Sequence, residues 1–343
     1  MRIETVELDK EKRVTLTAYI QDIEDDYGQI IKRPGVIILP GGAYINCSER
    51  EADPVAAAYL KAGYQAFILR YSVGEHAVWP APLEDYEQAM IMIRTEADRW
   101  NLYPDKIAVI GFSAGGHLAA AAATMSKNRP NAAVLGYAAA GEAVKDCNPS
   151  APNTIAAVDE DTCPCFLFAT RNDAVVPVCN TLEFAEALGK YDISFECHIY
   201  AYGPHGVSTV SSAILNKDTE ICSRVSHWVQ DSIDWLTDVL GEVTLDGIKE
   251  AVCKKHVTGN RDRYLSLRCT IGYLSEHPLA KELMESVLNN LTVKDVNDSG
   301  REIPVLDIVQ YFKNETLANL LHKFNIGQKK LDEIDKELSK ISN

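Results

Sequence analysis

Short apolar runs alternate with longer amphipathic segments along the first 240 residues. The runs at residues 35–39, 64–71 and 107–110 have the length and the β-branched content of buried strands. Residues 83–100 instead carry an apolar stripe at helical spacing. The remaining predicted strands are 1–8, 13–20, 132–137, 165–170 and 193–200, and the remaining predicted helices are 49–62, 118–125, 178–188 and 222–240. This alternation predicts an α/β fold with a mostly parallel sheet that helices cover on both faces.

The alternation stops after Gly241, and the rest of the chain has a different character. Apolar residues recur there at helical spacing, in segments 278–291, 304–312, 317–324 and 331–341. The excess of negative charge also ends near this point, because residues 241–343 are nearly balanced in charge. We therefore expect two domains, residues 1–240 and a small helical domain over residues 241–343. The role of the second domain stays open between a stabilising bundle, a homodimer interface and a cover for the substrate.

The net charge of −15 disfavours nucleic acid and anionic membranes as partners. No apolar run reaches the length of a membrane span, and residues 1–8 lack the basic and apolar regions of a leader, so a cytoplasmic protein is expected. The nine cysteines are an odd number and are expected to be reduced. Cys163-Pro164-Cys165 lacks the second cysteine pair that a zinc site needs. We assign it a structural role, and no metal or cofactor is predicted.

Candidate chemistry is concentrated where the strand at 107–110 runs through Gly111-Phe112-Ser113-Ala114-Gly115 into an alanine-rich helix. The order of strand, G-x-S-x-G and helix is typical of a turn that carries a nucleophilic serine. So tight a turn strains the backbone at its centre, and glycine on each side removes Cβ atoms that would clash. Ser113 then lies at a helix N-terminus, where the partial positive charge favours a developing oxyanion. The alternative is a glycine-rich turn that only packs.

A serine hydroxyl needs a base, and the base needs a group that holds its tautomer. Asp173 follows the strand at 165–170 and His205 follows the strand at 193–200, so both lie at carboxyl ends of strands. The order serine, acid, histidine is the one that accompanies this type of turn. His76 also follows a strand but precedes the serine. His117 lies one helical turn beyond Ser113 and is predicted to pack.

The tetrahedral intermediate of acyl transfer needs N–H donors for its oxyanion. One donor is expected at Ala114, directly after the nucleophile. The others are expected in the loop Gly41-Gly42-Ala43, which follows the strand at 35–39 and whose small side chains let the backbone come close. An ordinary glycine turn is the alternative for this loop.

Five short segments occur in a fixed order: P-G-G-A-Y at 40–44, L-R-Y-S-V at 69–73, G-F-S-A-G-G-H-L-A at 111–119, N-D-A-V-V-P-V at 172–178 and G-P-H-G at 203–206. Over about residues 30–240 the chain thereby resembles α/β-hydrolase esterases related to bacterial acetyl-xylan esterases. The resemblance implies an α/β-hydrolase fold, a triad of Ser113, Asp173 and His205, and oxyanion donors at Gly42, Ala43 and Ala114. Two departures bear on the substrate. Ala43 stands where the family usually has a third glycine, and the stretch 137–163 is shorter than in these relatives.

The leading hypothesis is a serine esterase that removes short acyl groups, above all acetyl, from small carbohydrates such as xylan fragments. Its acidic surface suits a neutral substrate, an acylated oligosaccharide. Tyr44 and Trp79 lie on loops after strands and are candidate substrate-binding residues, with packing as the alternative. A serine peptidase of the same fold and a non-catalytic binding module are the other hypotheses. The sequence shows no site for a peptide terminus, and no member of the triad is missing.

Overall fold

The computed structural model describes residues 1–23, 30–211, 214–216, 218–289, 291–294 and 302–343. The chain divides into two compact units, Met1–Lys255 and His256–Asn343. The expected boundary after residue 240 lies at the end of a helix, but the residues that follow it stay with the first unit. The N–H groups of Val252 and Cys253 both donate to the carbonyl oxygen of Asp238 at 2.8 Å. Ser194 N–H donates to the carbonyl oxygen of Lys255 at the same distance.

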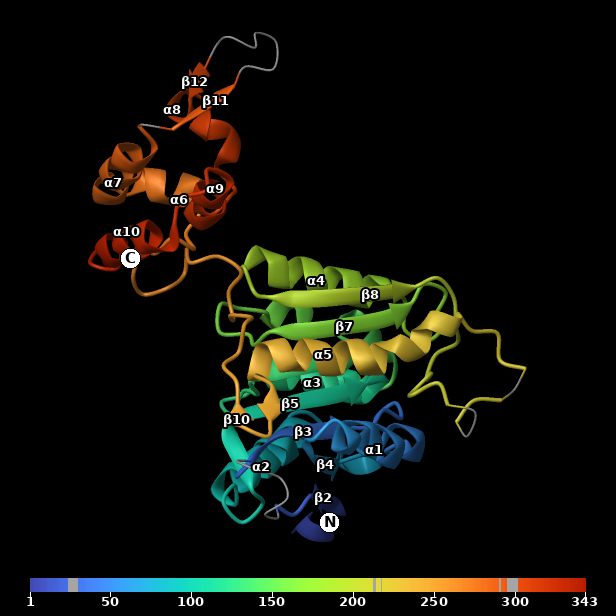
Figure 1. Ribbon diagram of the computed structural model, residues 1–343. Coiled ribbons are helices and arrows are strands. Elements are labelled where there is room, and N and C mark those ends of the chain that lie inside the picture. Colours follow the sequence, from blue (N-terminus) through green and yellow to red (C-terminus); the bar gives the residue numbers. More distant parts are fainter. Residues whose placement is uncertain (24–29, 212–213, 217, 290, 295–301) are drawn as a thin grey trace. The chain divides into compact units, whose positions relative to one another are not determined.

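The first unit is built on an eight-stranded sheet with the strand order β1-β2-β4-β3-β5-β6-β7-β8 (Figure 1). The strands are β1 (Arg2–Asp9), β2 (Val14–Ile20), β3 (Arg33–Leu39), β4 (Gln65–Arg70), β5 (Leu102–Phe112), β6 (Ala132–Gly136), β7 (Cys165–Thr170) and β8 (Phe195–Tyr200). β1 pairs with β2 and β2 with β4 in antiparallel fashion, and all later neighbours are parallel. The expected mostly parallel sheet is confirmed.

Helices cover both faces of this sheet. They are α1 (Asp53–Lys61), α2 (Ala81–Thr95), α3 (Ser113–Thr124), α4 (Cys179–Lys190) and α5 (Trp228–Leu240). Ile37 and Val109 point into the core that α2, α3 and α4 complete, whereas Ile38 and Ile110 point into the core of α1 and α5. Successive side chains of a strand point to opposite faces of the sheet, and both faces are buried. The central strands are therefore continuous apolar runs in the sequence.

Several boundaries differ from the predicted ones. β5 begins at Leu102, five residues before the predicted start, because Pro104 and Asp105 are exposed and interrupt the apolar pattern. The helix predicted at 83–100 ends at Thr95. The starts of two predicted helices, 49–62 and 222–240, are 3₁₀ turns, namely η2 (Glu49–Glu51) and η6 (Ser223–His227). Three further 3₁₀ turns, which were not predicted, lie in loops: η3 (Gly74–His76), η4 (Glu142–Asp146) and η5 (Ile155–Ala157). A small hairpin follows α5, formed by β9 (Val243–Thr244) and β10 (Gly247–Ile248).

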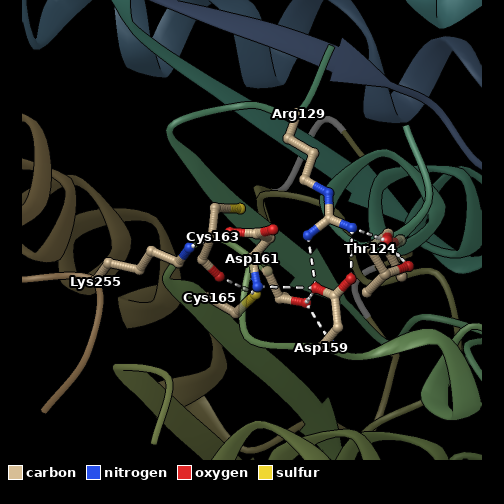
Figure 2. Close-up of polar contacts among 9 residues, drawn as sticks. Thr124, Arg129, Asp159, Asp161, Cys163, Cys165 and Lys255 are labelled. Carbon is tan, nitrogen blue, oxygen red and sulfur yellow. Dashed lines mark hydrogen bonds and ion pairs between the residues drawn. The ribbon is translucent and has the colours of Figure 1, made fainter. Parts of the chain in front are cut away.

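The Cys-Pro-Cys segment lies at the start of β7, within a polar cluster (Figure 2). Arg129 makes a two-pronged ion pair with Asp159, with N–O distances of 2.6 and 2.7 Å. Both thiols are buried, and Cys165 Sγ lies 3.2 Å from the carbonyl oxygen of Cys163. A hydrogen bond with Cys163, together with burial, holds the pKa of the Cys165 thiol well above its ordinary value. The segment therefore packs as part of the core.

The second unit has a core of its own. Its helices are α6 (Ile271–Glu276), α7 (Pro278–Leu288), α8 (Val305–Ile308), α9 (Leu317–Lys323) and α10 (Gln328–Leu338), with a 3₁₀ turn η7 (Val309–Phe312). A two-stranded sheet of β11 (Thr292–Lys294) and β12 (Glu302–Pro304) was not predicted, because three residues are too short for a period-two pattern. Asn290, near the end of the helix predicted at 278–291, lies outside the described residues. Among the described helices, none has the length and apolarity that a membrane crossing needs.

Candidate active site

Ser113 lies where β5 passes directly into α3, and it is the first residue of that helix. Its φ of +53° is in the left-handed region, which costs a residue with a Cβ about 1–2 kcal/mol. A Cβ at Gly111 would lie 2.1 Å from the carbonyl oxygen of Gly115, and a Cβ at Gly115 would lie 2.1 Å from that of Leu39. The turn is therefore strained, and it requires glycine on both sides of the serine as predicted.

The structure brings Ser113, His205 and Asp173 together. His205 Nε2 is 2.8 Å from Ser113 Oγ, and His205 Nδ1 is 2.7 Å from Asp173 Oδ2. Asp173 follows β7 and His205 follows β8, and because these strands are parallel neighbours, both loops leave the same edge of the sheet. The Asp173 side chain is buried, whereas 19% of the His205 side chain is exposed. This geometry can activate a hydroxyl with a base that is held in one tautomer.

Asp173 is held in its ionised form. Burial alone raises its pKa, but the hydrogen bond from His205 and those from the backbone N–H groups of Val176 and Val175 outweigh burial and hold the pKa below its ordinary value. The two backbone bonds go to Oδ1, with lengths of 2.9 Å from Val176 and 2.8 Å from Val175. The other oxygen is left for His205, so the carboxylate accepts the Nδ1 proton and leaves Nε2 to accept from the serine.

The three expected oxyanion donors lie around the serine. In the described part of the chain, no hydrogen bond uses the N–H of Gly42, Ala43 or Ala114, as the expected role of oxyanion donor requires. Gly42 has a φ of +130°, and a Cβ there would lie 2.2 Å from the carbonyl oxygen of Asn46. Ala43 takes a φ of +54°, a conformation that favours glycine. The loop is thus strained, like the turn at Ser113.

A pocket of about 600 Å³ opens at these groups. Most of its wall is the segment between β3 and α1, and the loops after β7 and β8 complete it. Its lining residues are Gly42, Ala43, Asn46, Cys47, Ser48, Glu49, Arg50, Glu51, Ser113, Val175, His205 and Gly206. A larger pocket of about 740 Å³ lies against α1 and α5, but Ser113 and His205 do not line it.

Tyr44 and Trp79, the two aromatic residues proposed to bind substrate, do not line the pocket at Ser113. Tyr44 is 2% exposed, and its hydroxyl donates to His117 Nδ1 at 2.7 Å. A φ of +57° turns its ring inward, where it packs edge-on against Tyr71. Trp79 is half-buried and packs edge-on against His117, with ring centroids 5.4 Å apart. Both rings thus pack against His117, as the packing alternative expects.

His117 and His76 take no part in the hydrogen bonds that join Ser113, His205 and Asp173. His117 is buried, and its Nε2 donates to the carbonyl oxygen of Pro152 at 2.8 Å. Burial lowers the pKa of His117 to about 4, so the ring is neutral and packs. His76 lies in η3 and lines a different pocket, together with Glu75 and Arg13.

Sequence reasoning missed Glu51 and Tyr137. Glu51 lines the pocket although it is buried, and Tyr137 packs edge-on against the imidazole of His205, with centroids 5.1 Å apart. Glu51 stands in a charged stretch before α1 that reads as a solvent-exposed helix start. Tyr137 ends an apolar run and reads as core. No pattern in the sequence marked either residue.

A sheet of this topology, with a serine in a strained turn and an acid and a base at later strand ends, is typical of α/β hydrolases. MGS-M1, an alpha/beta hydrolase enzyme from a Medee basin deep-sea metagenome library, is 44% identical to this chain. The match covers 70% of this chain and 98% of that one, with a TM-score of 0.65. The chain therefore belongs to the α/β-hydrolase family, and the expected fold class is confirmed.

Further relatives are esterases. The acetyl ester-xyloside bifunctional hydrolase of Caldicellulosiruptor lactoaceticus is 30% identical, over 65% of this chain and 87% of that one, with a TM-score of 0.57. An acetylxylan esterase of Xylanibacter ruminicola is 35% identical over 105 residues, which are 30% of this chain and 22% of that protein. The BD-FAE family model matches residues 22–137. The resemblance to acetyl-xylan-esterase-related hydrolases is confirmed. The chain spans about a third or less of the length of the curated relatives it matches.

Proposed function

We propose that this chain is a serine esterase that hydrolyses short-chain acyl esters, above all acetyl esters of xylan-derived or other carbohydrates. The observation that carries the proposal is the unbroken path of hydrogen-bond distances from Ser113 Oγ through His205 to the buried Asp173. The acetylxylan esterase and the acetyl ester-xyloside hydrolase among the relatives support an acetylated carbohydrate as the substrate.

In the first half of the reaction, Ser113 Oγ bonds to the carbonyl carbon of the ester while His205 Nε2 takes the hydroxyl proton. The carbonyl oxygen becomes an oxyanion, and the N–H groups of Gly42, Ala43 and Ala114 bind it. The bond between the carbonyl carbon and the sugar oxygen then breaks, and His205 gives its proton to that oxygen. The free sugar hydroxyl leaves, and an acetyl-serine ester remains.

In the second half, a water molecule takes the place of the sugar. His205 Nε2 takes a proton from the water while its oxygen bonds to the acetyl carbon. The same N–H groups bind the second oxyanion. When the bond to Ser113 Oγ breaks, His205 returns the proton to the serine, and acetic acid leaves with the second proton of the water and ionises in solution.

A small acyl group fits the walls of the pocket. Its lining includes Ser48, Glu49 and Arg50 but no residue of the segment 138–163, which follows β6 and carries the buried residues Ala138, Ala139 and Ala140. A longer acyl chain gains about 0.8 kcal/mol for each CH₂ group that it buries against apolar surface. Val175 is the one aliphatic side chain larger than alanine in that lining, so we expect a longer acyl chain to gain little.

Ser113→Ala tests the proposal, with 4-nitrophenyl acetate, acetylated xylo-oligosaccharides and a peptide amide as substrates. The parent is expected to hydrolyse both esters, and the variant to lose about 10⁴- to 10⁶-fold in kcat. Circular dichroism and thermal unfolding check that the variant is folded. Cleavage of the amide without hydrolysis of the esters would support a peptidase. Retention of ester hydrolysis within tenfold in Ser113→Ala would show that Ser113 is not the nucleophile.

A further inference from the structure

Glu51 is a buried carboxylate that the mechanism above does not use. It lies in η2 beside Ser113 and is 3% exposed. Its Oε2 accepts the backbone N–H of Gly41 at 2.7 Å, and its Oε1 accepts the hydroxyl of Tyr137 at 2.6 Å. Each oxygen faces a donor, which is the arrangement that an ionised carboxylate requires when it is buried.

One of the two groups that donate to Glu51, the N–H of Gly41, belongs to the loop Gly41-Gly42-Ala43, called the oxyanion loop below. Gly41 directly precedes Gly42 and Ala43. A Cβ at Gly41 would lie 2.7 Å from Glu51 Oε2 and 3.1 Å from Ser113 Cβ. Gly41 therefore lies close to both the carboxylate and the serine turn, with no room for a side chain between them. The N–H of Gly41 is the donor that Glu51 holds, so Glu51 sets the direction of the chain just before the two expected oxyanion donors.

The other group that donates to Glu51, the hydroxyl of Tyr137, contacts the loop that carries the base. The hydroxyl of Tyr137 accepts the N–H of Ser208 at 3.1 Å, and Ser208 follows His205 by three residues. Trp228 Nε1 donates to the carbonyl oxygen of Ser208 at 2.8 Å, so this point of the loop is held from both sides. The ring of Tyr137 also packs edge-on against the His205 imidazole, with an angle of 73° between the rings. Movement of Tyr137 would therefore move the base.

We propose that Glu51 is a positioning residue for the ester hydrolysis proposed above, on which this inference rests. Through one carboxylate, it ties the oxyanion loop at Gly41 to the His205 loop by way of Tyr137 and Ser208. It also brings a second negative charge near the imidazole, in addition to Asp173. The oxyanion loop and the His205 loop are then held at a fixed separation. The charge on Glu51 also stabilises the positive charge that His205 acquires during the reaction.

The groups around His205 define what the charge on Glu51 should do. Asp173 accepts from Nδ1, Ser113 lies at Nε2, and Tyr137 packs against the ring. Burial raises the pKa of Glu51, and the hydrogen bonds from Tyr137 and Gly41 and the charges of His205 and Arg50 act against this rise. The attraction between Glu51 and a charged His205 is mutual. Removing the negative charge should therefore make the charged form of His205 less favourable during the reaction.

Glu51→Gln tests this inference because it removes the charge and keeps the shape. We expect kcat for 4-nitrophenyl acetate to fall by about 10- to 100-fold with KM within threefold, because a misplaced oxyanion donor affects the transition state most. The midpoint of the acid limb of the kcat/KM profile should move to lower pH by about one unit. Asp85→Asn is the matched control. Asp85 is also buried and accepts one backbone N–H, from Ser72 at 2.7 Å, but it does not line the pocket at Ser113.

Tyr137→Phe provides a second variant should Glu51→Gln fail to fold. It should lower kcat in the same way, and the double variant should lose less than the product of the two single losses, because both changes break one connection. The rate at which diisopropyl fluorophosphate labels Ser113 is a further readout that needs no ester substrate. In that reaction Ser113 Oγ bonds to phosphorus, and fluoride leaves as the serine proton passes to His205.

The outcomes separate this inference from the proposed esterase function. A parental kcat and an unmoved acid limb in Glu51→Gln, in an enzyme that Ser113→Ala inactivates, would overturn the role of Glu51 and leave the esterase function intact. If the parent hydrolyses no ester, the rate at which diisopropyl fluorophosphate labels Ser113 tests the role of Glu51 instead. A rate that falls at least tenfold in both variants but not in Asp85→Asn supports the positioning role, and an unchanged rate overturns it.

Discussion

Replacing Asp173 by asparagine is a sharp test of the site, because the two side chains have the same shape. Oδ1 accepts the N–H groups of Val175 and Val176 at 2.8 and 2.9 Å. These donors remain in the variant, so the amide oxygen of the new side chain takes the Oδ1 position and its NH₂ group faces His205. His205 Nδ1 must then accept, and Nε2 carries a proton toward Ser113. The base is thus held in the wrong tautomer.

The expected loss is about 10⁴-fold in kcat, the size that this tautomer change has in a Ser-His-Asp site. It corresponds to about 5 kcal/mol in the activation barrier. The assay is steady-state hydrolysis of 4-nitrophenyl acetate at neutral pH.

The stability of the Asp173→Asn variant should also change. The pKa of Asp173 is lower in the folded protein than its ordinary value, so its ionisation stabilises the fold above about pH 4, and this contribution disappears as the pH falls through the folded pKa. The difference between the Tm of the parent and the lower Tm of the variant should therefore be largest near neutral pH and become smaller in acid.

Asp159→Asn is the matched control for this experiment (Figure 2). Asp159 precedes β7, at the opposite end of the strand from Asp173, and pairs with Arg129. Its replacement should lower Tm and leave kcat unchanged. A kcat for Asp173→Asn within tenfold of the parent at neutral pH, in a variant that unfolds cooperatively, would refute the assignment of Asp173 as the group that orients His205.

Three further outcomes can be checked independently. Gly115→Ala should destabilise the protein by more than about 3 kcal/mol in chemical unfolding, because its Cβ would overlap the carbonyl oxygens of Leu39 and Pro40, 2.1 and 2.4 Å away; unfolding at the parental denaturant concentration would contradict this. The ratio kcat/KM should fall from acetyl through butyryl to octanoyl nitrophenyl esters, and a preference for octanoyl would contradict the small acyl site. A fragment of residues 1–255 should keep the kcat of the full chain, whereas a fragment of residues 1–240 should show a lower Tm because it lacks the Val252, Cys253 and Lys255 hydrogen bonds; equal Tm values for the two fragments would contradict the later boundary.

The sequence by itself was sufficient for the order of strands and helices and for the turn at Ser113. These features depend on neighbouring residues. A buried strand is an apolar run, and a tight turn needs glycine where a Cβ would overlap the backbone, as at Gly111 and Gly115. The sequence also predicted where Asp173 and His205 lie, because parallel strands have their carboxyl ends at one edge of the sheet. Helix ends and the short strands β11 and β12 were less accurate, since exposed or very short elements have a weak pattern.

Only the tertiary structure decided which side chains meet across distant segments. Tyr44 stands on a loop that sequence placed beside the substrate, but a left-handed φ turns its ring into the core, where its hydroxyl meets His117. Glu51 stands in a charged segment that sequence placed in solvent, but its carboxylate is buried between Gly41 and Tyr137. His117 lies 73 residues from Tyr44 along the chain, and Tyr137 lies 86 residues from Glu51. Burial and hydrogen bonding of this kind depend on how the sheet packs as a whole, and no local pattern of apolar and polar residues records them.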